Sequence, residues 1–163
     1  MTEVFGSISG GSVLRMHFRS WARSIKNVTK TDDLFSILPI DRNLVATFGD
    51  HVDWQPSWEN TFPAIDRIPD ELLMLGAFTG GECVGIIVYT PQFNWIMTLA
   101  VKRPHRRRGV GSALVRHLAA HPAIGVPKVR MINVQASDSG MLAFLAGLGF
   151  TRWVDQYKMA CGL

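Results

Sequence analysis

The chain contains little cysteine and no pattern of metal ligands. Its two cysteines, Cys83 and Cys161, lie far apart in the 163 residues. Cys83 lies in an apolar segment typical of a strand, so we predict a buried, reduced thiol there. The five histidines do not have the spacing of zinc ligands. The sequence therefore predicts no structural metal.

Long apolar runs and a secretion signal are also missing. No run approaches the roughly 20 apolar residues needed to span a bilayer, so no membrane partner is expected. Residues 1–12 are rich in Gly and Ser and lack the basic-then-apolar order of a signal peptide. We predict a mobile leader over residues 1–12, a single domain over residues 13–163, and a cytoplasmic location. A content of 47% hydrophobic and 18% charged residues fits a globular protein.

The chain has only a modest excess of positive charge. The net charge is +4, and much of it comes from the turn at residues 102–108. The sequence has no zinc spacing, basic helix or aromatic-studded sheet motif that would indicate nucleic-acid binding. No nucleic-acid partner is therefore expected, although a nucleic-acid-binding protein that uses this Arg-rich turn remains an alternative.

The most informative stretch, residues 95–120, combines a strand, a turn with glycines and a helix. Residues 96–101 form an apolar run that predicts a buried strand, and residues 113–119 have apolar spacing for one helix face. The N–H groups at a helix start lack partners and carry the positive end of the macrodipole, so they stabilise an anion. Gly109 and Gly111 lack the Cβ atoms that would keep a phosphate away from the backbone.

We therefore predict a phosphate or pyrophosphate site in this turn, formed by Arg106, Arg107, Arg108, Gly109, Val110, Gly111 and Ser112. The three arginines add charge that cannot be titrated away. The P-loop pattern is absent, because no Gly-Lys-Ser/Thr follows the glycines. The dinucleotide fingerprint also fails, because its third glycine position is Leu114.

The other segments predict a mixed α/β fold. The sequence favours an antiparallel meander of three strands, at residues 72–78, 83–89 and 96–101, with a glycine turn at 79–82. After the helix it favours a strand at 128–134, a helix that starts within residues 136–140 and runs to 148, and strands at 150–154 and 156–160. Before residue 72 the pattern is weaker, with a strand at 13–18, helices at 20–28 and 32–38, and short elements at 41–48 and 58–67.

The strand end Leu99-Ala100-Val101 followed by Arg106-x-x-Gly109-x-Gly111 resembles the acyl-CoA signature of the GNAT N-acetyltransferase superfamily. The resemblance covers about residues 72–160. It implies a GNAT-like twisted, mostly antiparallel sheet with splayed central strands, flanked by helices. It also implies an acyltransferase that moves an acetyl group from acetyl-CoA, its cosubstrate, to an amine acceptor.

The resemblance carries over position by position. It implies that the backbone of Leu99, Ala100 and Val101 contacts the pantetheine arm, and that the turn from Arg106 to Ser112 wraps the pyrophosphate. Asp138 stands where the family often has an Asn that touches the cofactor arm, and as a carboxylate it can only accept hydrogen bonds. Ser139 beside it can donate.

Leu145 departs from the family pattern. Many members carry a Tyr there, four residues before the Gly of a Gly-Phe pair, and that hydroxyl protonates the departing thiolate. A thiolate with a pKa of about 8–9 can leave with help only from water or amides. The departure leaves the general acid open and is the main argument for an alternative, a non-catalytic module that binds acyl-CoA.

The catalytic and acceptor-binding residues are predicted from the remaining polar and aromatic side chains. Because only a neutral amine is nucleophilic, a base must remove a proton, and Glu59 is our first candidate with Asp53 second. Tyr89 and Tyr157 are candidates for the acid. The acceptor pocket is predicted to include Trp54, Trp58 and Phe62. The identity of the amine and the oligomeric state stay open, with a homodimer among the alternatives.

Overall fold

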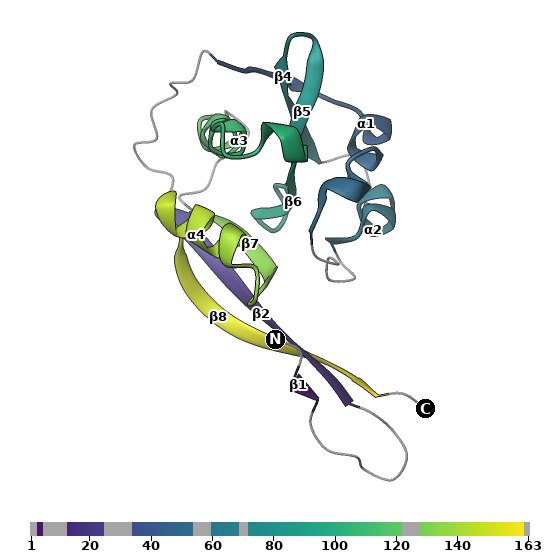
Figure 1. The fold of residues 1–163 in the computed structure, drawn as a ribbon, viewed down its shortest axis with the longest axis vertical. Coiled ribbons are helices and arrows are strands. Elements are labelled where there is room, and N and C mark those ends of the chain that lie inside the picture. The colour runs from purple at the N-terminus through teal and green to yellow at the C-terminus, as the bar shows by residue number, and fades with distance from the viewer. Residues whose placement is uncertain are drawn as a thin grey trace. The chain divides into compact units, whose positions relative to one another are not determined.

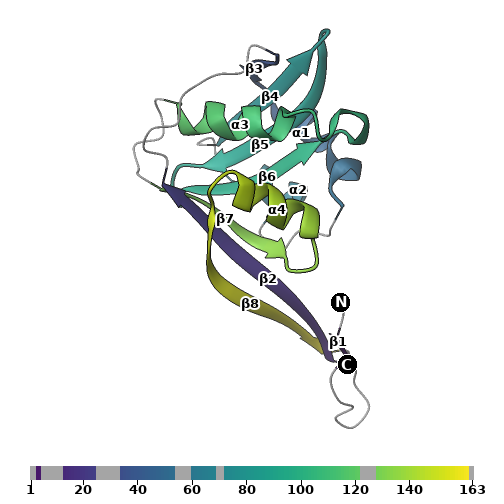
Figure 2. The ribbon, with the colours of Figure 1, turned by 60° about the vertical axis from the view of Figure 1, so that its left-hand side comes forward.

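The computed structural model describes residues 3–4, 13–24, 34–53, 60–68, 72–121 and 128–161. Contacts within the chain divide it into two compact units, one formed by residues 1–23 with 131–163 and one by residues 24–130. The chain is drawn in Figures 1 and 2. The prediction of a single domain over residues 13–163 is not tested by this division and stays a prediction.

The unit of residues 24–130 is built on four antiparallel strands in the order β6-β5-β4-β3. Their bounds are Ser36–Pro39 for β3, Leu73–Thr79 for β4, Glu82–Thr90 for β5 and Trp95–Val101 for β6. The predicted meander is confirmed. Its first turn holds Gly80 and Gly81 at φ +58° and +82°, which favours glycine and suits a two-residue hairpin.

Helices lie on both faces of these four strands (Figure 1). Helix α3, Val110–Ala119, packs on one face against β4, β5 and β6. The other face carries α1, Arg42–Ala46, the short turn η1, Gly49–His51, and α2, Phe62–Asp66. Because both faces are covered, β5 is buried from Cys83 to Thr90 without the alternation of a half-exposed strand.

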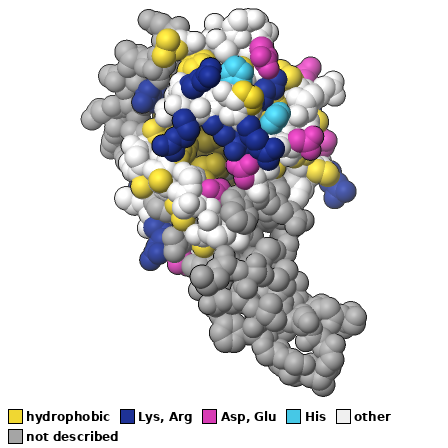
Figure 3. All heavy atoms as spheres, viewed as in Figure 1, with side chains coloured by type: hydrophobic (Ala, Val, Ile, Leu, Met, Phe, Trp, Pro, Cys, Tyr) yellow, Lys and Arg dark blue, Asp and Glu magenta, His cyan; other side chains and the backbone are white. Residues whose placement is uncertain are grey.

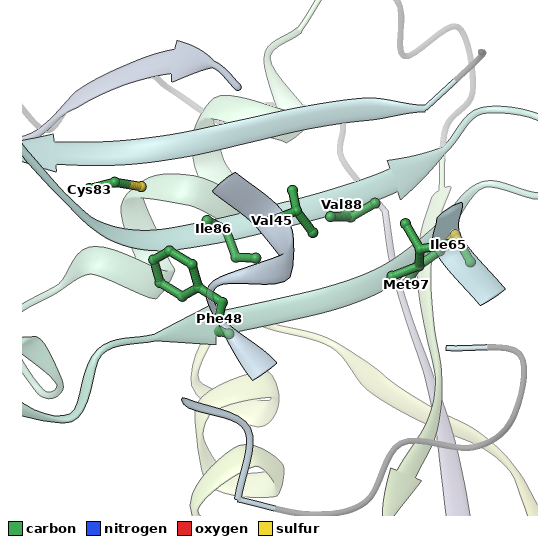
Figure 4. Close-up of a cluster of buried hydrophobic side chains, with 8 residues drawn as sticks. Val45, Phe48, Ile65, Cys83, Ile86, Val88 and Met97 are labelled. Carbon is green, nitrogen blue, oxygen red and sulfur yellow. The ribbon is translucent and has the colours of Figure 1, made fainter. Parts of the chain in front are cut away.

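A compact apolar cluster joins α1 and α2 to the sheet (Figure 4). Val45, Phe48 and Ile65 come from the helical side, and Ile86 and Met97 from the strands, each 6% exposed or less. Cys83 also belongs to this cluster at 7% exposed, so the predicted buried thiol is confirmed. Burial raises the pKa of this thiol, which disfavours the reactive thiolate.

The other unit contains a long antiparallel pair and one helix. Strand β2, Val13–Ser24, pairs with β8, Thr151–Cys161, and the short β1, Glu3–Val4, pairs with β2. Strand β7, Lys128–Gln135, begins in the unit of residues 24–130 and continues into this one, where it is followed by α4, Ser139–Gly147. The predicted strand and helix at these positions are confirmed.

Three sequence predictions are wrong. Residues 20–24, expected to begin a helix, instead belong to β2, and Ser36–Pro39, expected to end a helix, is strand β3. The two strands expected at the C-terminus are one continuous strand, β8. In each case hydrogen bonds to a strand distant in the sequence override the local preference.

Two further expectations concern features that the described residues show only in part. The leader predicted over residues 1–12 lies outside the described residues except for the two residues of β1. The splay of the central strands depends on how the two units are placed, and it stays a prediction. Among the described helices, none has the length and apolar character needed to cross a membrane.

Candidate functional site

The site centres on the connection between β6 and α3. After β6 ends, the Lys102 N–H donates to the Val84 carbonyl at 2.9 Å, which fixes the exit of the chain onto β5. A short 3-10 turn, η3 (Arg103–His105), follows, and α3 begins at Val110. The predicted strand, glycine turn and helix are therefore present in this order.

The backbone N–H groups from Arg107 to the start of α3 have no acceptor among the described residues. Gly109 is the N-cap of α3, at φ +88° and with no capping side chain. The first helical bond runs from the Ala113 N–H to the Gly109 carbonyl at 2.9 Å. No hydrogen bond within the described chain uses six backbone amides, which we call the anion cradle: those of Arg107, Arg108, Gly109, Val110, Gly111 and Ser112.

The anion cradle has the shape and space for a phosphate. Arg107 and Gly109 both have positive φ, at +61° and +88°, and turns of this kind direct successive N–H groups toward one point. A Cβ added at Gly109 would meet no atom within 4 Å. The space beside Gly109 is therefore open, and glycine places no side chain in it.

Positive charge surrounds the cradle. Arg107 and Arg108 are exposed, and neither forms an ion pair with another described residue. Figure 3 shows Lys and Arg side chains gathered on one face of the molecule, with His and acidic side chains among them. Lys102 forms an ion pair with Glu82 at 2.8 Å, and the hydrogen bond from Lys102 lowers the pKa of the Glu82 carboxyl group.

Arg106 has a different role from the one expected for its side chain. Its guanidinium donates to the Val101 carbonyl at 2.9 Å, to the His51 carbonyl at 2.6 Å, and to the Asp53 carboxylate. Its backbone N–H donates to the Arg103 carbonyl at 3.2 Å. Because these groups already have protein acceptors, the geometry makes Arg106 an anchor for the turn, while the amides of the cradle begin at Arg107.

The same contacts bear on the predicted base Asp53. One carboxylate oxygen accepts from Arg106, and the other lies 3.5 Å from the Arg103 guanidinium. Both oxygens are thus engaged with arginine, which counts against this group as a proton acceptor from an amine. Glu59, the first candidate, lies outside the described residues, as do Trp54 and Trp58.

The geometry also counts against Tyr89 as the acid. Its side chain is 1% exposed, and its hydroxyl donates to the Asn94 side-chain carbonyl at 3.1 Å. Burial raises the pKa of this phenol. Asn94 lies in the turn between β5 and β6 at φ +57°, so the tyrosine stabilises that turn. The side chain of Tyr157 is outside the described residues.

Residues predicted to contact the cofactor arm lie in two places. Leu99, Ala100 and Val101 end β6, opposite Ile87, Ile86 and Gly85 of β5. In the other unit, Asp138 is the N-cap of α4, and its carboxylate accepts the Met141 N–H at 2.9 Å. Ser139 is exposed at the first position of that helix. Asp138 thus starts the helix, and one of its oxygens is already used.

Phe62 packs against the core, and Leu145 belongs to it. Phe62 opens α2 and packs, half-buried, against the apolar cluster beneath the helices, which gives it a structural role beside the predicted one. Leu145, at the position of the family tyrosine, is fully buried. No hydroxyl is therefore available at that position.

Sequence reasoning missed one feature of the site and one buried polar side chain elsewhere in the same unit. Arg106 binds His51 and Asp53 from more than 50 residues away, and no local pattern signals such a contact. Asn60 is 6% exposed, and its side-chain oxygen has no hydrogen-bond partner within the described part of the chain. Within the described part of the chain, no group of three or more His, Cys, Asp or Glu side chains could hold a metal ion.

Comparison with known proteins identifies the family. The family described as the acetyltransferase (GNAT) family matches residues 33–150, well over half of the chain. The chain belongs to the GNAT acetyltransferase family. The match reaches about 40 residues further toward the N-terminus than the resemblance in the sequence did. A search of curated proteins finds no sequence that matches.

Solved structures share the GNAT fold at low sequence identity. A GNAT-family acetyltransferase from Novosphingobium aromaticivorans, described as putative, has a TM-score of 0.66 at 16% identity, covering 99% of this chain and 71% of that one. The ribosomal-protein-S18-alanine N-acetyltransferase of Escherichia coli has a TM-score of 0.61 at 20% identity, covering 74% and 79%. A Drosophila protein has a TM-score of 0.70 at 17% identity, covering 90% of this chain and 51% of its own. The chain thus spans about half the length of the Drosophila structure, and the mixed α/β fold with a mostly antiparallel sheet is confirmed.

Proposed function

We propose that this GNAT protein is an N-acetyltransferase that moves an acetyl group from acetyl-CoA to an amine. The observation that carries the proposal is the anion cradle, which follows β6 and η3 and combines six amides that have no acceptor among the described residues with open space at Gly109. A diphosphate carries the charge and the acceptor oxygens that such amides bind. Arg107 and Arg108 add positive charge beside it.

The proposed reaction is a direct transfer. The neutral amine attacks the thioester carbonyl carbon, the new C–N bond forms, and the C–S bond breaks. The amine proton passes to a base, for which Glu59 remains the predicted residue. The sulfur leaves as the thiolate of CoA and takes a proton from water, since Leu145 offers none.

An assay of thiol release tests the proposal. The protein is incubated with acetyl-CoA and a panel of small amines, amino acids and peptides with a free N-terminus. We expect release of free CoA that depends on the amine, together with an acetylated product detected by mass spectrometry. If calorimetry shows that acetyl-CoA binds but no amine in the panel causes release of free CoA, the proposal that the protein is an enzyme is contradicted.

The second candidate function is a module that binds acyl-CoA without chemistry. It is favoured by the fully buried Leu145, which replaces the only hydroxyl that the family resemblance supplies for catalysis. A module of this kind is expected to bind acetyl-CoA tightly without releasing free CoA when an amine is added. DNA binding that is salt-dependent and survives excess CoA would instead favour a nucleic-acid-binding protein. We expect no binding to DNA. No feature of the described residues tests the cytoplasmic location or the homodimer, and both stay predictions.

We predict opposite effects of Arg107→Gly on stability and on binding. At φ +61° a residue other than glycine is strained, so this variant should raise the free energy of unfolding by about 0.5–1 kcal/mol. It also removes a guanidinium beside the cradle, which should weaken acetyl-CoA binding by about tenfold. Thermal denaturation and calorimetry measure the two effects.

Arg108→Gly is the matched control for this prediction. It removes the same charge from the neighbouring position, but Arg108 is not among the residues with positive φ. We therefore expect weaker acetyl-CoA binding without any gain in stability. Equal unfolding temperatures for the two variants would contradict the strain at Arg107.

A further inference from the structure

Asp53 and the anion cradle are joined through one side chain. The Arg106 guanidinium reaches across 53 residues to the Asp53 carboxylate and across 55 to the His51 carbonyl, while its Nε donates to the Val101 carbonyl. All of these residues lie in the same compact unit. The guanidinium of Arg106 is therefore fixed on three sides.

The backbone of Arg106 leads directly into the cradle. Arg106 is extended, at φ −68° and ψ 159°, and the next residue, Arg107, is left-handed at φ +61°. Such a strained conformation persists only when surrounding contacts hold it. The contacts of the Arg106 side chain are placed to do this, because they tie the residue before the reversal to the end of β6 and to residues 51–53.

We propose that Asp53 is a positioning residue for CoA binding, which acts through Arg106 to hold the anion cradle in its binding conformation. This inference rests on the proposed function and extends it to an acidic residue. In this role Asp53 acts without any contact of its own with the phosphate. It holds the guanidinium that sets the direction of the six cradle amides.

The direction in which Asp53→Ala changes CoA affinity distinguishes a positioning role from simple electrostatic repulsion. If Asp53 were only a negative charge near an anion site, Asp53→Ala would tighten CoA binding. As a positioning residue, its loss should raise the dissociation constant of CoA by about tenfold, because a hydrogen-bonded charge pair is broken. Calorimetric titration with CoA measures the change, well below the unfolding temperature of each variant.

Asp50→Ala is the matched control. Asp50 lies three residues earlier, is exposed in the short turn η1, and is not among the described hydrogen-bond partners of Arg106. This variant removes the same charge from the same segment, and we expect the dissociation constant of CoA to change by less than about twofold. Tighter CoA binding by Asp53→Ala, or equal binding by both variants, would overturn the proposal.

Arg106→Lys and Arg106→Met provide an independent test. A lysine keeps the positive charge but cannot donate to three acceptors in the fork geometry of arginine. We therefore expect Arg106→Lys to lose nearly as much CoA affinity as Arg106→Met. If lysine retained the affinity of the parent, the charge of residue 106 would matter rather than its anchoring, and the inference would be wrong.

The kinetic and double-variant measurements complete the test. In the acetyl transfer assay, KM for acetyl-CoA should rise in Asp53→Ala while kcat at saturation stays within about twofold. Combining Asp53→Ala with Arg106→Met should weaken binding little beyond Arg106→Met alone, because both break one anchor. If the parent protein fails to bind CoA, the proposed function fails. If the parent binds and the two effects simply add, the positioning role alone fails.

Discussion

Gly109→Glu is expected to weaken acetyl-CoA binding by at least about a hundredfold. The side chain would start in the open space beside Gly109, where a Cβ meets no described atom within 4 Å. Its carboxylate would accept hydrogen bonds from the cradle amides at the start of α3 and act as an internal competitor for the phosphate. It would also repel any anion that approached. Isothermal calorimetry with acetyl-CoA measures the loss.

Gly81→Glu is the matched control for this prediction. Gly81 lies at φ +82° in the turn between β4 and β5, close to the +88° of Gly109, and a Cβ there also meets no atom within 4 Å. Both variants should therefore lose a similar free energy of unfolding, about 1–2 kcal/mol. Only Gly109→Glu should lose acetyl-CoA. If the Gly109→Glu variant binds acetyl-CoA as tightly as the Gly81→Glu variant does, the proposed position of the phosphate site is wrong.

Gly109→Ala separates bulk from charge at the same position. It carries the backbone strain of the left-handed conformation but adds one methyl group and no carboxylate. We expect an intermediate loss of acetyl-CoA affinity, with a stability close to that of the glutamate variant. This ordering would show that the negative charge, as well as the lost space, prevents phosphate binding.

Gly85→Ala is expected to lower the free energy of unfolding by about 2–3 kcal/mol. Gly85 lies in β5 directly beneath the start of α3. A Cβ there would lie 2.6 Å from Val110 Cγ1, and 3.3 Å from both the Ala100 carbonyl oxygen and Leu114 Cδ1. The first distance is too short for two carbon atoms, so helix or strand must move. Because Val110 belongs to the anion cradle, the shift should also weaken acetyl-CoA binding.

Val110→Ala should rescue this variant. It removes the atom that the new Cβ would meet. In the Val110→Ala background, Gly85→Ala should therefore lower the free energy of unfolding by at least about 1 kcal/mol less than it does in the parent. The four proteins are compared by denaturant unfolding. Additive losses of unfolding free energy would show that the short approach to Val110 is not the cause.

Gly147→Ala is expected to raise the free energy of unfolding, whereas the same substitution at Gly85 lowers it. Gly147 ends α4, is exposed, and offers a Cβ position with no atom within 4 Å. There the methyl group should stabilise the helix by about 0.5–1 kcal/mol. The contrast with Gly85 tests the close approach of α3 to β5, rather than a general effect of adding a methyl group.

The sequence by itself determined the local parts of the fold and of the site. Glycines at 80, 81 and 109 take positive φ, and residues 96–101 and 110–119 form the strand and helix that flank the turn. Each of these features depends on residues within one turn or one element. Short-range sterics and apolar periodicity are therefore sufficient to predict them. The N-cap role of Asp138 follows the same rule, since its partner Met141 is three residues away.

Only the tertiary structure decided the contacts between distant segments. Strand β2 forms because residues 151–161 pair with it, and Ser36–Pro39 forms a strand because β4 offers a free edge. Arg106, expected beside a phosphate, instead anchors Asp53 and His51. These outcomes depend on hydrogen-bond partners supplied by segments that are far away in the sequence. A local pattern carries no information about which acceptor the folded chain will place beside a given donor.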